Sequence, residues 1–90
     1  MIEYLTLNKL IMTISKEILP NREVDIFKTN VMQQADAEQI IQLLSNYFPN
    51  HNINFDLDDC DKILRVEGVD NNKVFIKNAL LQCGFMAEVL

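Results

Sequence analysis

Apolar residues recur along the chain at two spacings, one typical of helices and one typical of strands. From residue 7 to residue 18 they follow each other at steps of three and four residues, which places them on one helical stripe. Pro20 and Asn21 end this segment. The stripe consists of Leu7, Leu10, Ile11, Ile14 and Ile18. We predict an amphipathic helix here, outside the main domain.

A second helical stripe lies between Ala35 and Phe48 and ends at Pro49. It is formed by Ala37, Ile40, Ile41, Leu44 and Phe48. The segment before it, residues 23 to 31, is rich in β-branched and aromatic residues, as strands are. Its apolar residues alternate in two different phases, so we predict a strand without assigning its buried side. The two phases are Val24 and Ile26 on one side, and Phe27, Thr29 and Val31 on the other.

Two further strand patterns flank an acidic cluster. Ile53, Phe55 and Leu57 alternate with polar residues and lead into the cluster, residues 58 to 61. A polar run between two apolar runs predicts a hairpin turn. From Lys62 to Glu67 the pattern resumes as a strand, with Leu64 and Val66 predicted to point inward and Gly68 to close it.

The last third of the chain predicts a helix and a final strand. Asp70, Asn71 and Asn72 offer side chains for the N-cap of the helix, and Gly84 is the expected left-handed stop. The predicted buried stripe is Ile76, Ala79, Leu80 and Cys83. The final strand alternates at Phe85, Ala87 and Val89.

These elements predict an α+β fold, a ferredoxin-like βαββαβ sandwich in residues 22 to 90 with a helical extension in residues 1 to 21. Two helices cover one face of its antiparallel sheet, and Ile63, Met86 and Leu90 are expected to point to the other face. The extension could cover that face or pair with its copy in a dimer. It could also be a poorly ordered extension from an upstream start codon.

Composition narrows the classes of function. The 90 residues carry a formal charge of −5, which disfavours nucleic acid as a partner. Apolar runs are too short and too often interrupted by charge to span a membrane, and no leader pattern occurs, so a cytoplasmic location is the default expectation. His51 is the single histidine and falls in a predicted surface loop, far from both cysteines. No local nucleophile and base stand together, so we expect no enzyme.

The second half of the domain resembles a heavy-metal-associated domain, the small module of copper chaperones and metal-transporting ATPases. The likeness lies in Asn54-Phe55-Asp56-Leu57, in Lys62-Ile63-Leu64-Arg65-Val66-Glu67-Gly68, and in Ile76-x-x-Ala79-Leu80-x-x-x-Gly84-Phe85. The resemblance implies the ferredoxin-like fold. Members of the family bind soft metal through Met-x-Cys-x-x-Cys after the first strand, because two thiolates hold copper(I) well. Matching the family's helix positions puts Val31 at the methionine, and Gln33 and Asp36 at the cysteines, so this motif is missing.

Soft ligands nevertheless gather at the corresponding edge of the predicted fold. The first loop, the hairpin turn and the end of the second domain helix share that edge, and they carry Met32, Cys60 and Cys83. These residues could bind copper(I), or zinc with Asp36 added. The alternative is that Met32 lies on the loop surface, Cys60 in a turn and Cys83 buried in its helix.

Two functions therefore remain open. One is a non-enzymatic binding or interaction module that acts on a protein partner or by self-association, through the N-terminal helix or another surface. The other is a carrier or sensor of copper(I) or zinc.

Overall fold

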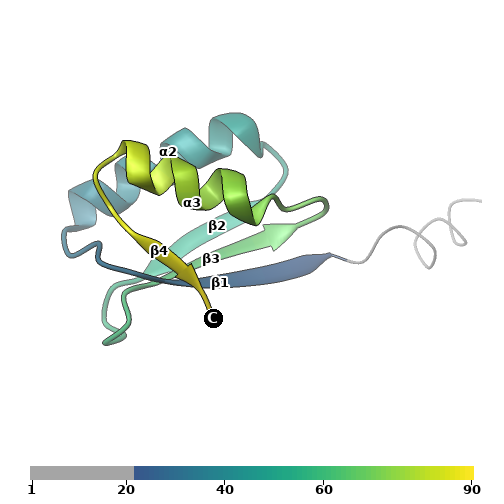
Figure 1. Ribbon diagram of the computed structural model, residues 1–90. Helices are drawn as coiled ribbons and strands as arrows, with labels where there is room; N and C mark the ends of the chain where they lie inside the picture. Colours follow the sequence, from purple (N-terminus) through teal and green to yellow (C-terminus); the bar gives the residue numbers. More distant parts are fainter. Residues whose placement is uncertain (1–21) are drawn as a thin grey trace, which may run out of the picture.

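The computed structural model describes residues 22–90, and the predicted helix between Leu7 and Ile18 lies outside the described residues. The described part has the predicted order of strands and helices (Figure 1). The elements are β1 (Glu23–Thr29), α2 (Gln34–Tyr47), β2 (Asn52–Asp56), β3 (Ile63–Gly68), α3 (Lys73–Gln82) and β4 (Ala87–Val89).

The four strands form one antiparallel sheet in the order β2-β3-β1-β4. Both helices lie on one face of this sheet, as Figure 1 shows. The architecture is therefore α+β, and it is compatible with the ferredoxin-like βαββαβ arrangement. β1 and β3 are the inner strands, whereas the short β4 and β2 form the edges.

The ends of α3 follow the predicted capping chemistry. The side chain of Asn72 accepts a hydrogen bond from the Phe75 N–H at 3.0 Å and so satisfies a free donor of the first turn. At the other end Gly84 has a φ of 89°, a conformation that glycine adopts without strain. The Gly84 N–H donates to the Leu81 carbonyl at 2.9 Å and the Phe85 N–H to the Leu80 carbonyl at 2.8 Å. These two bonds form a Schellman motif.

The hydrophobic core lies between the sheet and the two helices. Phe27 is fully buried on the helix side of β1. The side of this strand that faces the core, which the sequence did not decide, is therefore the side of Phe27. Leu64 and Val66 point inward as predicted. The core cluster consists of Phe27, Val31, Ala37, Ile40, Leu44, Ile53, Leu64, Val66, Ile76, Ala79, Leu80 and Ala87. The prediction that Cys83 is buried on the α3 stripe was wrong, because the helix ends there and the side chain is exposed at the C-cap.

The end of the molecule where β1 begins contains two tightly packed polar features. Asp25 points to the helix side of β1 and is 6% exposed, and the Lys73 ammonium lies 3.7 Å from its carboxylate. His51 was predicted to be a surface histidine, but both of its ring nitrogens are buried and the ring packs 4.8 Å from that of Phe48. The ring also fills the space over Gly68, where a Cβ would lie 2.3 Å from it. Gly68 therefore makes room for His51, which the strand pattern did not reveal.

Candidate functional site

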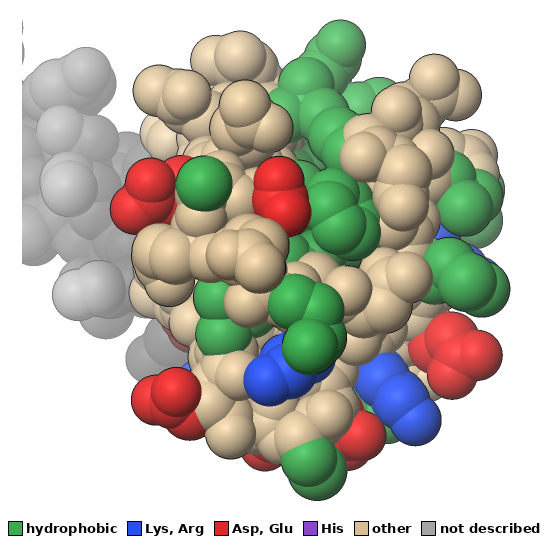
Figure 2. Space-filling model, turned by 90° about the vertical axis from the view of Figure 1, so that its left-hand side faces the viewer, with side chains coloured by type: hydrophobic (Ala, Val, Ile, Leu, Met, Phe, Trp, Pro, Cys, Tyr) green, Lys and Arg blue, Asp and Glu red, His purple; other side chains and the backbone are tan. Residues whose placement is uncertain are grey.

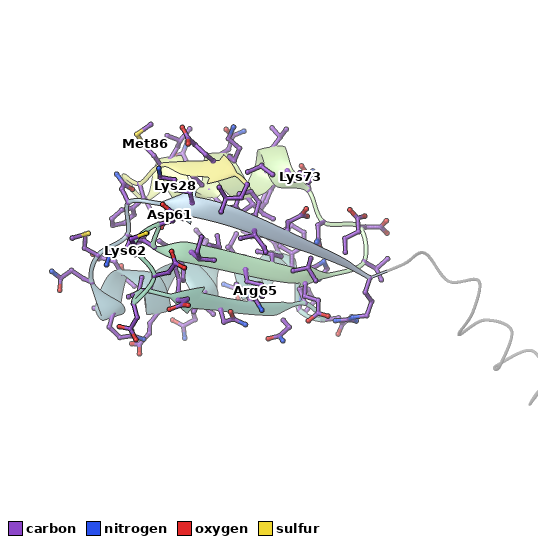
Figure 3. The ribbon with its side chains drawn as sticks, turned by 90° about the horizontal axis from the view of Figure 1, so that it is seen from below. Lys28, Asp61, Lys62, Arg65, Lys73 and Met86 are labelled. Atoms are coloured by element: carbon purple, nitrogen blue, oxygen red, sulfur yellow. The ribbon has the colours of Figure 1, made fainter. Side chains whose placement is uncertain are left out.

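Three segments meet at the opposite end of the molecule, which we call the loop end. They are the loop between β1 and α2, the hairpin turn between β2 and β3, and the end of α3 (Figure 1). Figure 3 labels Met86 at this end, and Met32, Cys60 and Cys83 belong to the three segments by their positions in the chain. The sulfur-bearing residues of the described part are Met32, Cys60, Cys83 and Met86. The predicted juxtaposition of these segments is thus confirmed.

The hairpin turn at the loop end is fixed by its own hydrogen bonds. The Asp59 carboxylate accepts from the Asp61 N–H at 2.8 Å, and the Asp59 carbonyl accepts from the Lys62 N–H at 2.9 Å. The Lys62 ammonium donates to the Leu57 carbonyl at 2.8 Å across the turn. Cys60 is therefore displayed on an ordered turn with its side chain exposed.

Cys60 has two carboxylates beside it. One ligand atom from each of Asp59, Cys60 and Asp61 lies within 4.8 Å of the others. The Lys28 ammonium lies 3.8 Å from the Asp61 carboxylate and would compete with a cation there. This local set is therefore weakly suited to a hard cation.

The predicted metal ligands lie at the loop end without forming one compact group of donors. Met32 is 67% exposed in the loop after β1, and Asp36 is half-buried in the first turn of α2. Cys83 is exposed at the C-cap of α3. Neither Cys83 nor Asp36 joins Cys60 in its group, and residues 22–90 contain no second group of three His, Cys, Asp or Glu ligands. A site using all four residues would need side chains to rearrange.

A second candidate region lies on the helical layer, in a groove between α2 and α3. Tyr47 at the end of α2 is 61% exposed, and its ring centroid lies 4.8 Å from that of Phe75 in an edge-to-face contact. The cavity measures ≈ 290 Å³. Its lining consists of Leu43, Tyr47, Phe75, Asn78, Ala79 and Gln82.

The groove carries no charged side chain in its lining, although 23% of the chain's residues are charged. Figure 2, seen from the loop end, shows a band of hydrophobic side chains that descends from the helical layer between polar ones. Sequence reasoning missed this region because it followed only the main stripe of each helix. Leu43 and Tyr47 are four residues apart, as are Phe75 and Ala79, so a second and narrower stripe was present as a signal.

Comparisons of the chain with protein-family models, curated proteins and solved structures find no match. Within residues 22–90, no helix has the length and hydropathy needed to cross a membrane.

Proposed function

We propose that the chain is a small non-enzymatic interaction module, and that the groove between α2 and α3 receives an uncharged, apolar side chain from a partner protein. The observation that carries this proposal is the uncharged lining of the groove on the side of Tyr47 that faces Leu43 and Ala79, with Tyr47 itself exposed. Cores of protein interfaces are depleted in charge and enriched in tyrosine and phenylalanine. The hot spots of interfaces are likewise enriched in tyrosine.

The open rim of the groove favours a partner's side chain over a free small molecule. Sites for small molecules bury most of the ligand. The groove measures ≈ 290 Å³, and its rim is open at Tyr47, Asn78 and Gln82. The two amide side chains can hydrogen-bond the backbone that carries the inserted side chain. The polar rim and apolar floor match the general anatomy of a protein interface.

Selection from a random peptide library on the immobilised full chain tests the proposal. We expect enriched peptides that share an apolar anchor residue. Their affinity should fall by about tenfold or more for Tyr47→Ala, as for a hot-spot residue. Leu81→Ala is the matched control, because Leu81 is 57% exposed and does not line the groove.

The control variant should bind the peptides as tightly as the parent chain. The proposal fails if no peptide is enriched. It also fails if the enriched peptides lose affinity equally for the two variants, since both truncate an exposed apolar side chain.

A second candidate function is the transport or sensing of copper(I) or zinc at the loop end. The exposure of Met32, Cys60 and Cys83 at one end supports it, because thiolate and thioether ligands favour copper(I) and thiolates also bind zinc. The resemblance to heavy-metal-associated domains points to the same edge. When this chain is matched to that family, the family's two cysteines fall at Gln33 and Asp36. Neither residue supplies a thiolate.

Titration of the protein with copper(I) against a competing chelator tests this second candidate. It predicts about one bound equivalent, which the double variant Cys60→Ser, Cys83→Ser loses. Met86→Leu is the control, because it removes a sulfur atom at the same end but outside the predicted ligand set. Binding no stronger than the chelator's, or equal loss in Met86→Leu, contradicts the metal site.

A further inference from the structure

The face of the sheet that points away from α2 and α3 has no covering element among residues 22–90 (Figure 3). We call it the open sheet face. The strand register places its side chains in three rows across the sheet. The rows are Asn52, Glu67 and Val24; Asn54, Arg65 and Ile26; and Asp56, Ile63, Lys28 and Glu88.

Apolar and charged side chains alternate on this face. Val24 is 50% exposed, and Ile26 lies next to Arg65 near the middle of the sheet. Leu90 extends the row of Ile26, since its N–H donates to the Ile26 carbonyl at 2.8 Å, and it is 66% exposed. The face thus offers an apolar strip along β1 and Leu90, with the charged side chains of Arg65 and Glu67 beside it on β3.

We propose that residues 7 to 18 of the same molecule cover the open sheet face as an amphipathic helix. The apolar stripe of this segment is Leu7, Leu10, Ile11, Ile14 and Ile18. Such a stripe needs an apolar partner in water. The other face of the sheet is already occupied by α2 and α3.

The connection to β1 restricts where this helix can pack. Only residues 19 to 22 separate the stripe from Glu23, the first residue of β1. Four residues span at most ~14 Å when fully extended. Because β1 is an inner strand, the connector joins the sheet between its two edges.

The last residue of the connector already interacts with the open face. Arg22 Nε lies 3.9 Å from the carboxylate of Glu67, whose side chain belongs to the open sheet face. This exposed ion pair adds little stability, and it places the Arg22 side chain on the side of the open sheet face. Pro20 lies two residues before Arg22 and allows the reversal that would bring the helix back over the strands.

The lengths of the helix and of the sheet agree. A helix over residues 7 to 18 would be ~18 Å long at 1.5 Å per residue. The seven residues of β1 extend over ~23 Å at about 3.3 Å per residue. The helix therefore fits on the face within the length of β1. Its apolar stripe would meet Ile26, Val24 and Leu90.

Charge reversal on the stripe of the full chain tests the proposal. In Leu10→Asp, Ile14→Asp the stripe can no longer pack on an apolar surface. The matched control is Met12→Asp, Thr13→Asp, which adds the same two charges on the opposite side of the predicted helix. The readouts are the backbone amide resonances, the rates of tryptic cleavage after Lys9 and Lys16, and the molar mass by light scattering.

We expect the stripe variant to shift the resonances of Val24, Ile26 and Arg65 while those of α2 and α3 stay in place. Cleavage after Lys9 and Lys16 should accelerate by about tenfold, because docking protects the segment. The control should leave resonances and rates as in the parent chain, and all forms should be monomers.

Three results overturn the proposal. The first is an unchanged spectrum and unchanged cleavage in the stripe variant. The second is a set of shifts over the groove between α2 and α3, which would place the segment there. The third is a parent dimer that the stripe variant dissociates, which would make a second copy the occupant of the face.

Discussion

The two sides of this small domain both expose apolar residues, but in different forms. The groove on the helical side is concave, has uncharged walls and is framed by two separate helices. On the open sheet face the apolar residues alternate with charges in rows set by the strand register. In our two proposals, the groove receives a single side chain from another protein, whereas the open sheet face receives a segment that is already attached to the start of β1. The fold would then separate a surface for a partner from a surface for its own chain.

Neighbouring residues of β3 provide the strongest contrast between the two sides. Leu64 is fully buried under the helices, whereas Ile63 points to the open sheet face and is 9% exposed. We expect Leu64→Ala to lower the free energy of unfolding by about 4 kcal/mol, since it leaves an enclosed cavity. Ile63→Ala should cost about 2 kcal/mol, because Ile63 lies at the hairpin end of the face, opposite Asp56 and outside the contact proposed for residues 7 to 18. No enclosed cavity forms there, so the cost is that of moving the lost methyl groups out of water. Chemical denaturation measures both, and equal losses would mean that the two sides are equally closed.

The two glycines of the chain should respond differently to alanine. A Cβ at Gly68 would lie 2.3 Å from the His51 ring, so Gly68→Ala should cost about 2–3 kcal/mol. At Gly84 the space is open, and only the positive φ opposes a side chain, at a cost of about 1 kcal/mol. Adding His51→Ala to Gly68→Ala should recover part of the lost stability in a double-mutant cycle. If the losses of stability from the two substitutions simply add, the His51 ring is not what opposes a Cβ at Gly68.

The cap of α3 holds Phe75 at the groove. Because the Asn72 side chain accepts the Phe75 N–H, Asn72→Ala should lower stability by about 1 kcal/mol. It should also speed amide exchange in the first turn of α3. Asn54→Ala on the open sheet face is the control, and its effect should stay within about 0.5 kcal/mol. A larger effect at Asn54 than at Asn72 would count against this role of the cap.

Within residues 22–90, the sequence was sufficient to predict the order of the elements and most of the core. Period-two patterns and helical stripes are imposed by burial on one side, and they identified Leu64, Val66 and Ile76 correctly. Capping chemistry is equally local, so the roles of Asn72 and Gly84 were recognisable from the sequence alone.

Features that depend on packing between distant segments were not readable in the same way. β1 carries apolar residues in both phases, and only its pairing with β3 and β4 decides that Phe27 faces the helices. Cys83 continues the α3 stripe in sequence, yet the helix ends there and exposes it. The contact of His51 with Gly68 joins residues that are far apart in the sequence. It therefore produces no periodic pattern of apolar residues from which it could be predicted. The groove was hidden because its stripe is narrower than the one that faces the core.

The smallest expected effect concerns the stability of the groove itself. Tyr47→Ala removes the edge-to-face contact with Phe75, at a ring distance of 4.8 Å, from an exposed position. We expect a loss of about 0.5–1 kcal/mol in thermal or chemical denaturation. A loss as large as that of Leu64→Ala would mean that Tyr47 supports the fold, and that any binding defect of the variant is indirect.

The most direct measurement is a titration of the isotope-labelled full chain with a selected peptide, followed through its backbone amide resonances. The account predicts shifts at Leu43, Tyr47 and Phe75, with those of Val24, Ile26 and Arg65 unchanged. Shifts concentrated on Val24, Ile26 and Arg65, or at the loop end around Cys60, would contradict the assignment of the groove as the surface that binds a partner.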